Sequence, residues 1–222
     1  MKLIKDIIEE FKTILKGNTL DAVIPPVLFL VLINRLELTT TLVISTIVSI
    51  LLLLIRIYHK DKILYAVIVI IGVLVTTVFT YISNNASNFF LPDIIGTSVL
   101  IIITLISIII KRPIAAYLSH ITRGWDLNWF KRDDVRPAYI EVSMFWLVFF
   151  IVRLIIEIRL YFAATVSELA WANIILGFPV TIGVLTISYV YGIWRLHTLK
   201  GPGIDEFIEN KQPPYKGQTK GF

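Results

Sequence analysis

The chain has 222 residues, of which 56% are hydrophobic and 17% are charged, and its mean hydropathy is +0.80. A soluble domain of this length cannot bury so much apolar surface, and the apolar residues form continuous blocks long enough to span a bilayer. The net charge of +5 does not indicate nucleic acid, because membrane proteins concentrate Lys and Arg in cytoplasmic loops, and the lack of cysteine excludes disulfides and thiolate chemistry.

The first segment, residues 1–17, is predicted to be an amphipathic helix. Leu3, Ile7, Phe11 and Ile14 recur at three- or four-residue spacing, and charged residues cover the opposite face. A helix of this kind lies in the membrane interface as an anchor or binds a partner protein.

Six apolar segments follow, and they predict an all-α integral membrane protein with six transmembrane helices arranged as three antiparallel hairpins. The predicted transmembrane domain covers residues 18–197. Its segments are residues 22–38, 39–57, 63–82, 91–110, 138–161 and 171–194.

The positions of the basic residues predict the topology. If six helices alternate in direction, all but three of the 21 Lys and Arg residues fall on one side. The exceptions are Arg35 in an opposite loop, and Arg153 and Arg159 inside the fifth segment. The positive-inside rule therefore predicts a multi-pass protein with both termini in the cytoplasm.

Two cytoplasmic segments are predicted outside the helices, the loop 111–137 and the tail 198–222. In the loop, IAAYLSHI predicts an interfacial helix, and Trp125 and Trp129 suit the headgroup layer. Arg132 and neighbouring bases are expected to bind anionic lipid headgroups. The tail is rich in Gly and Pro and is predicted to be mostly flexible.

The fifth segment contains FIVRLIIEIRLYF, which places Arg153, Glu157 and Arg159 in an apolar helix. Counted from Glu141, Arg153 lies about 18 Å along the helix, beyond the middle of a hydrocarbon core of about 30 Å. Glu157 follows on the same face, and Arg159 is near enough to the outer surface to snorkel. A charge at the bilayer centre costs roughly 2.5–3.5 kcal/mol, so the pair must face the bundle interior or a wet cavity. Two interpretations stay open: a site for an anionic group, and an ion pair that fixes helix register.

Prolines provide a second signal for a membrane site. Pro25 and Pro26 begin the first segment, Pro92 begins the fourth, and Pro179 is expected to interrupt the sixth. Broken helices often border substrate sites in transporters, although a plain kink is the more common outcome.

No catalytic motif is present. The sequence lacks a glycine-rich phosphate loop, HExxH and GxSxG, and its three histidines lack metal-ligand spacing. We therefore expect no enzymatic activity, no cofactor and no metal.

The series NFFLPDIIGTSVL, KRP, FIVRLIIEIRLYF and ILGFPV resembles a bacterial membrane family, common in actinobacteria, that is catalogued as a domain of unknown function. The resemblance covers residues 17–195 and includes Phe89 to Pro92, Lys111 to Pro113, and Arg153 with Leu160-Tyr161. More distantly, the layout is similar to the intracellular septation protein A family of envelope and division proteins. These resemblances imply a polytopic protein of the bacterial cytoplasmic membrane, and they bring no known reaction.

Two classes of function remain. The first is binding or transport of a small polar or anionic solute by Arg153, Glu157 and Arg159, with Asn34 and Arg35 as ligands from another helix. The second is a non-catalytic envelope or septation-related assembly protein that contacts lipids, partner membrane proteins or a second copy of itself. A wet cavity at Arg153 distinguishes the first from the second.

Overall fold

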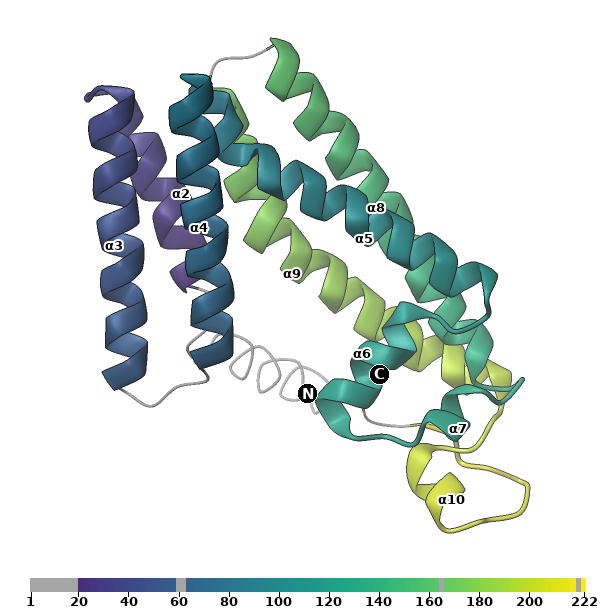
Figure 1. Ribbon diagram of the computed structural model, residues 1–222. Coiled ribbons are helices and arrows are strands. Elements are labelled where there is room, and N and C mark those ends of the chain that lie inside the picture. The colour runs from purple at the N-terminus through teal and green to yellow at the C-terminus, as the bar shows by residue number, and fades with distance from the viewer. Residues whose placement is uncertain (1–19, 59–62, 164–165, 219–220) are drawn as a thin grey trace. The chain divides into compact units, whose positions relative to one another are not determined.

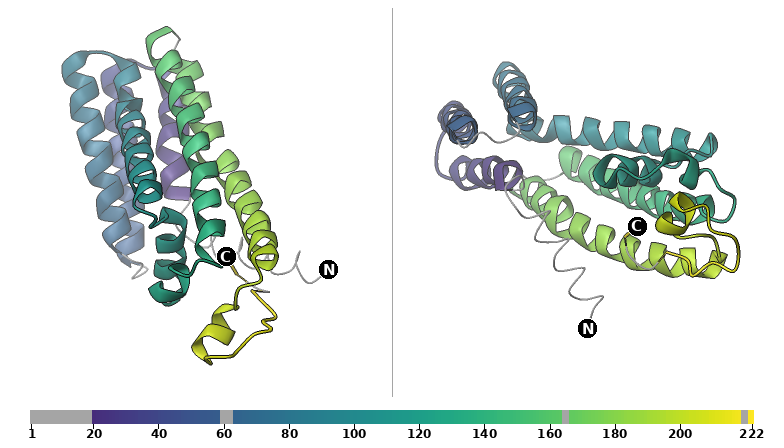
Figure 2. Two further views of the ribbon diagram at one scale, coloured as in Figure 1. Left: turned by 90° about the vertical axis from the view of Figure 1, so that its right-hand side faces the viewer. Right: turned by 90° about the horizontal axis from the view of Figure 1, so that it is seen from below.

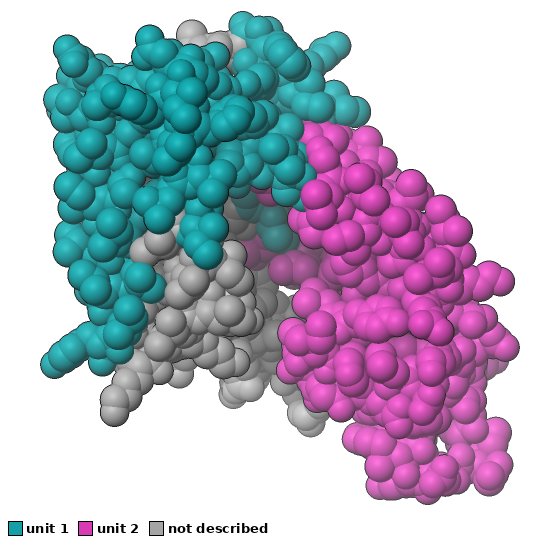
Figure 3. All heavy atoms as spheres, in the orientation of Figure 1, with its two compact units in different colours: residues 1–96, 155–181 teal, residues 97–154, 182–222 magenta. Residues whose placement is uncertain are grey.

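The computed structural model describes residues 20–58, 63–163, 166–218 and 221–222 (Figure 1). All regular secondary structure within these ranges is helical. The chain divides into two compact units (Figure 3). Unit 1 contains residues 1–96 and 155–181, and unit 2 contains residues 97–154 and 182–222. The predicted amphipathic helix of residues 1–17 lies outside the described residues.

A helix lies in each of the six predicted apolar segments, and shorter helices lie between and after them. In chain order they are α2 (Leu20–Ile33), α3 (Leu38–Tyr58), α4 (Ile63–Ser83), the 3-10 helix η1 (Ala86–Phe90), α5 (Leu91–Ile109), α6 (Ile114–Arg123), α7 (Leu127–Phe130), α8 (Arg136–Ala163), α9 (Val166–Leu199) and α10 (Ile204–Ile208). The first helix ends earlier than predicted, because the backbone N–H groups of Arg35 and Leu36 both turn back to the Leu32 carbonyl oxygen, at 2.9 and 2.8 Å.

Four stretches of the described helices are long and apolar enough to cross a membrane. They are Leu38–Ile55, Ala86–Ile109, Arg136–Ala163 and Val166–Leu199. A shorter apolar stretch covers Ile71–Ser83. Large apolar side chains along the long helices are exposed, which is the reverse of a soluble fold. The helices therefore indicate a multi-pass membrane protein, while the number of six spans stays a prediction.

The core of unit 1 is built around the FFLP sequence. The ring of Phe29 in α2 stacks on that of Phe89, with centroids 3.8 Å apart, and meets Phe90 edge-on at 5.9 Å. The side chain of Asn85 accepts a hydrogen bond from the Ser87 backbone N–H at 3.0 Å and so caps η1. The FFLP phenylalanines therefore anchor α2 against the start of α5.

Small hydroxyl side chains bring α3 and α4 together. These two helices lie side by side in both views of Figure 2. The hydroxyl oxygens of Thr46 and Thr77 are 3.0 Å apart across the pair. Thr41, Ser45 and Ser49 recur every fourth residue along α3 and are buried. Small side chains of this kind let helix backbones approach closely in a membrane.

In unit 2, α6 is attached to two other helices through its first N–H groups. The Ile114 N–H donates to Ser107 Oγ at 3.1 Å, and the Ala115 N–H donates to Ser143 Oγ at 3.2 Å. These bonds satisfy donors that a helix start leaves without partners. Gly124, with φ of 72°, ends the helix in the left-handed region. The helix predicted from IAAYLSHI is thus present.

The loop and the tail share one hydrophobic core in unit 2. Trp129 has no exposed surface, and its indole N–H donates to the Pro202 carbonyl oxygen at 2.9 Å. The ring of Phe222 stacks on Tyr139 with centroids 4.2 Å apart. Tail flexibility stays a prediction about dynamics, but the described tail residues have these fixed packing partners and include the helix α10.

Candidate functional site

The predicted intramembrane charges lie in the second half of α8. Arg153, in unit 2, is half-buried, whereas in unit 1 Glu157 has 0% exposure and Arg159 is exposed. Arg153 and Glu157 are one helical turn apart on the same face of a continuous helix, and both have interaction partners. Burying a carboxyl group in an apolar helix costs free energy that a protein rarely spends without a functional reason. Glu157 is therefore the strongest functional candidate.

Glu157 shares its helix face with Tyr161, which belongs to a chain of hydrogen bonds in unit 1. The Tyr161 hydroxyl donates to Oδ1 of Asn88, and Nδ2 of Asn88 donates to Ser83 Oγ at 2.6 Å. Ser83 Oγ in turn donates to the Phe79 carbonyl oxygen at 2.8 Å. This chain links α8 to η1 and α4 through polar groups, and the Asn88 side chain within it is buried.

Asn173 in α9 adds a buried donor to unit 1. Its side chain is buried, and Nδ2 has no hydrogen-bond partner in the described part of the chain. An unsatisfied buried amide costs roughly 1–3 kcal/mol, which a bound acceptor group would recover. Leu169, one turn earlier on the same helix, lies in the core of this unit.

The two secondary ligands predicted on the first helix lie at its end. Asn34 is exposed, and its Nδ2 donates to the Leu30 carbonyl oxygen at 2.9 Å, so its amide closes the C-terminus of α2. Arg35 is exposed in the following turn. The structure therefore assigns Asn34 a local structural contact, and substrate binding by either residue stays a prediction.

The four prolines that the sequence analysis singled out all lie within helices. The backbone of α2 is helical through Pro25 and Pro26, and Pro92 is the second residue of α5. The break expected at Pro179 does not interrupt α9, which continues from Val166 to Leu199. Pro179 still lacks an N–H, so the carbonyl four residues earlier has no helical donor.

The predicted lipid contacts have different environments. Trp129 is fully buried in protein, whereas Trp125 is partly exposed. Of these two tryptophans, only Trp125 has surface that a lipid could contact. Arg132 donates from Nε and Nη2 to the Asp134 carboxylate, both at 2.8 Å. This pairing holds the pKa of Arg132 above its ordinary value and neutralises its charge locally.

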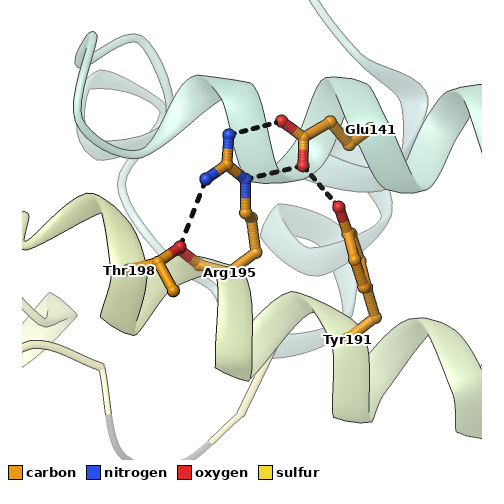
Figure 4. A network of polar contacts seen from close by, with 4 residues as sticks. All are labelled: Glu141, Tyr191, Arg195 and Thr198. Atoms are coloured by element: carbon orange, nitrogen blue, oxygen red, sulfur yellow. Dashed lines mark hydrogen bonds and ion pairs between the residues drawn. The ribbon is translucent and has the colours of Figure 1, made fainter.

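A second polar network, in unit 2, joins α8 to α9 (Figure 4). Arg195 donates from Nε to Glu141 Oε2 at 2.7 Å and from Nη2 to Oε1 at 2.8 Å. The Tyr191 hydroxyl donates to the same Oε2 at 2.7 Å, and Arg195 Nη1 donates to Thr198 Oγ1 at 3.2 Å. A bidentate pair of this kind fixes orientation as well as distance. The sequence gives no signal for it, because the pair is 54 residues apart.

Long apolar helices that carry a few internal polar groups define the class, a multi-pass membrane protein. Residues 16–196 match the family described as protein of unknown function (DUF3159), and the chain belongs to that family. The resemblance to a domain of unknown function is thereby confirmed. Searches of curated proteins and of solved structures returned no match.

Proposed function

We propose that the protein binds or transports a small polar or anionic solute within the membrane and is not an enzyme. The observation that carries this proposal is the fully buried Glu157 in an apolar helix long enough to span the bilayer. Arg153, one turn away, supplies the cation for an anionic group, and Arg159 lies toward the outer surface. Asn34 and Arg35 remain secondary ligands.

The unpartnered amide of Asn173 supports the same proposal. It is a buried donor in the unit that holds Glu157, and a solute with an acceptor oxygen is its chemical complement. Tyr161 and Asn88 continue the polar lining from α8 to η1.

The proposal places the protein in the bacterial cytoplasmic membrane with six spans in three hairpins and both termini cytoplasmic. The topology rests on the distribution of Lys and Arg along the sequence, and the bacterial membrane is what the family resemblance implies. The alternative function is a non-catalytic envelope or septation-related assembly protein, which contacts lipids, partner membrane proteins or a second copy of the chain.

Aqueous access to position 153 separates the two functions. Arg153→Cys, made with Glu157→Gln to limit damage from an uncompensated acid, places a single thiol in a chain without cysteine. A membrane-impermeant thiol reagent, applied from each side in turn, should label this residue if a wet path reaches it.

Val152→Cys is the matched control, because Val152 is an exposed apolar residue adjacent in α8. We expect position 153 to react faster than position 152 from at least one side. A folded protein in which neither position reacts contradicts the transport proposal and favours the assembly function.

A further inference from the structure

Helix α6 has a buried face of small residues and an exposed face of large apolar residues. Its small residues Ala115, Ala116 and Ser119 are buried against the core of unit 2. Its large residues face outward: Tyr117 is 37% exposed, Leu118 43% and Ile121 77%. A helix on the surface of a soluble domain buries its large apolar side chains, so this outward face is suited to lipid.

Hydrogen bonds at the start of α6 fix its position along the helices α5 and α8. Only residues 110–113 separate the end of α5 from the start of α6. The bonds from α6 to Ser107 in α5 and to Ser143 in α8 hold its first turn against both apolar helices. The first turn of α6 is therefore held beside the end of a candidate membrane span.

Two bases just before α6 have no acidic partner within the described ranges of the chain. Lys111 and Arg112 are exposed, and neither forms an ion pair with any carboxylate among the described residues. Two arginines further along the loop are different, since Arg132 is paired with Asp134 and Arg136 with Asp133. Lys111 and Arg112 thus place two adjacent exposed positive charges directly before α6.

We propose that α6 lies in the headgroup layer and forms a binding site for an anionic phospholipid. Lys111 and Arg112 hold the lipid phosphate, while Tyr117, Leu118 and Ile121 lie along its acyl chains. The observation that carries this proposal is that an exposed apolar face and two exposed cations, which no described carboxylate pairs with, lie together at the end of a candidate membrane span. The site is independent of Glu157 and of solute binding.

Lipid retention tests the two cations. The full chain is purified in detergent micelles that contain phosphatidylcholine and phosphatidylglycerol, and native mass spectrometry counts the phosphatidylglycerol that stays bound. Lys111→Gln with Arg112→Gln should lower retention at least about tenfold, because each surface cation contributes about 1 kcal/mol.

The matched control is Lys200→Gln with Lys216→Gln, which removes the same charge from two exposed lysines of the same unit. The control should retain phosphatidylglycerol as the unmodified chain does, and added inorganic phosphate should not displace the lipid. Equal losses in both variants, no loss in either, or displacement by phosphate overturns the proposal.

A second measurement does not depend on charge. A spin label at Ile121→Cys, in the chain reconstituted in vesicles of the same two lipids, should be accessible to oxygen and shielded from a water-soluble nickel reagent. A label at Asn128→Cys, an exposed polar position on α7, should show the opposite preference. Greater access of the nickel reagent to position 121 than of oxygen overturns the proposal.

Discussion

Glu206 organises the tail through a single carboxylate that accepts three backbone hydrogen bonds. Its donors are the N–H groups of Lys216 at 2.9 Å, Gly203 at 2.9 Å and Gly217 at 3.0 Å. These bonds favour the ionised form and hold the pKa of Glu206 below its ordinary value of 4.5. The bond to Gly203 caps the start of α10, and the bond to Lys216 connects this helix to a residue ten positions further along the chain.

The lowered pKa of Glu206 predicts a pH-dependent tail. Since the folded pKa is below the unfolded value, the stabilisation is complete above pH 4.5 and is lost as the pH falls through the folded value. Hydrogen exchange at the amides of Gly203, Lys216 and Gly217 should accelerate over that acid range, after correction for intrinsic rates. Glu206→Gln should remove most of this pH dependence and expose the amides at neutral pH. Equal protection in both chains would contradict the prediction.

At the residue scale, a sequence reveals charged side chains inside a membrane helix more readily than it reveals buried amide side chains. Arg153 and Glu157 stand out because they interrupt an apolar block. Asn88 and Asn173 do not, because one asparagine in a loop or helix end is ordinary, and only burial shows that each is enclosed. The pairing of Arg132 with Asp134, two residues away, is visible in the sequence but competes there with several neighbouring acids and bases.

The network around Glu141 connects two long elements, α8 and α9. Its cation and carboxylate are each about one-third exposed, so water screens part of their attraction. The bidentate geometry and the Tyr191 hydroxyl compensate for this screening by holding the carboxylate in one orientation. The network therefore fixes how the two helices pair at their polar ends.

A double-mutant cycle measures the contribution of this network. Glu141→Gln and Arg195→Gln should show a coupling free energy of about 1 kcal/mol, at the upper end for partly exposed pairs. Tyr191→Phe should destabilise the protein by about 0.5–1.5 kcal/mol, because it removes one hydrogen bond. Unfolding in detergent and denaturant, followed by circular dichroism, provides the free energies. Additive effects of the two charge substitutions would show that the pair contributes nothing.

At the element scale, the long helices are predictable and their packing is not. Runs of apolar residues determine where α3, α4 and α9 form, and Pro113 marks the start of α6. The shared core of loop and tail depends on Trp129 and Pro202, which are 73 residues apart, and no periodicity in the sequence specifies such a contact. The same aromatic residues fit a headgroup layer equally well from sequence alone, since both environments favour a ring with one polar edge.

At the scale of the whole molecule, the predicted topology depends on whether α2 crosses the membrane. The 14 described residues of α2 extend about 21 Å of a hydrocarbon core of about 30 Å, and the residues before Leu20 lie outside the described ranges. The distribution of basic residues nevertheless requires α2 to cross if both termini are cytoplasmic. The charge pattern alone therefore predicts that α2 crosses the membrane, and this prediction needs a direct test.

Reporter fusions test the topology directly. An alkaline phosphatase fused after residue 36 should be active if α2 crosses, because that turn would lie outside the cytoplasm. The same reporter fused after residue 60 or residue 132 should be inactive, and a fluorescent protein at these two positions should be bright. Phosphatase activity after residue 132 would contradict the six-span topology, and inactivity after residue 36 would show that α2 does not cross.

The stacking of Phe222 on Tyr139 depends on a glycine in α9, Gly192, whose lack of a side chain leaves room for the Phe222 ring. A Cβ atom added at Gly192 in α9 would fall on the ring of Phe222, so the aromatic ring has room only above glycine. Gly192→Ala adds one methyl group without a change in charge, and we expect it to displace the Phe222 ring from Tyr139. Such a variant offers a way to ask what the docked tail contributes to the lifetime of the protein in a cell, separately from every electrostatic effect.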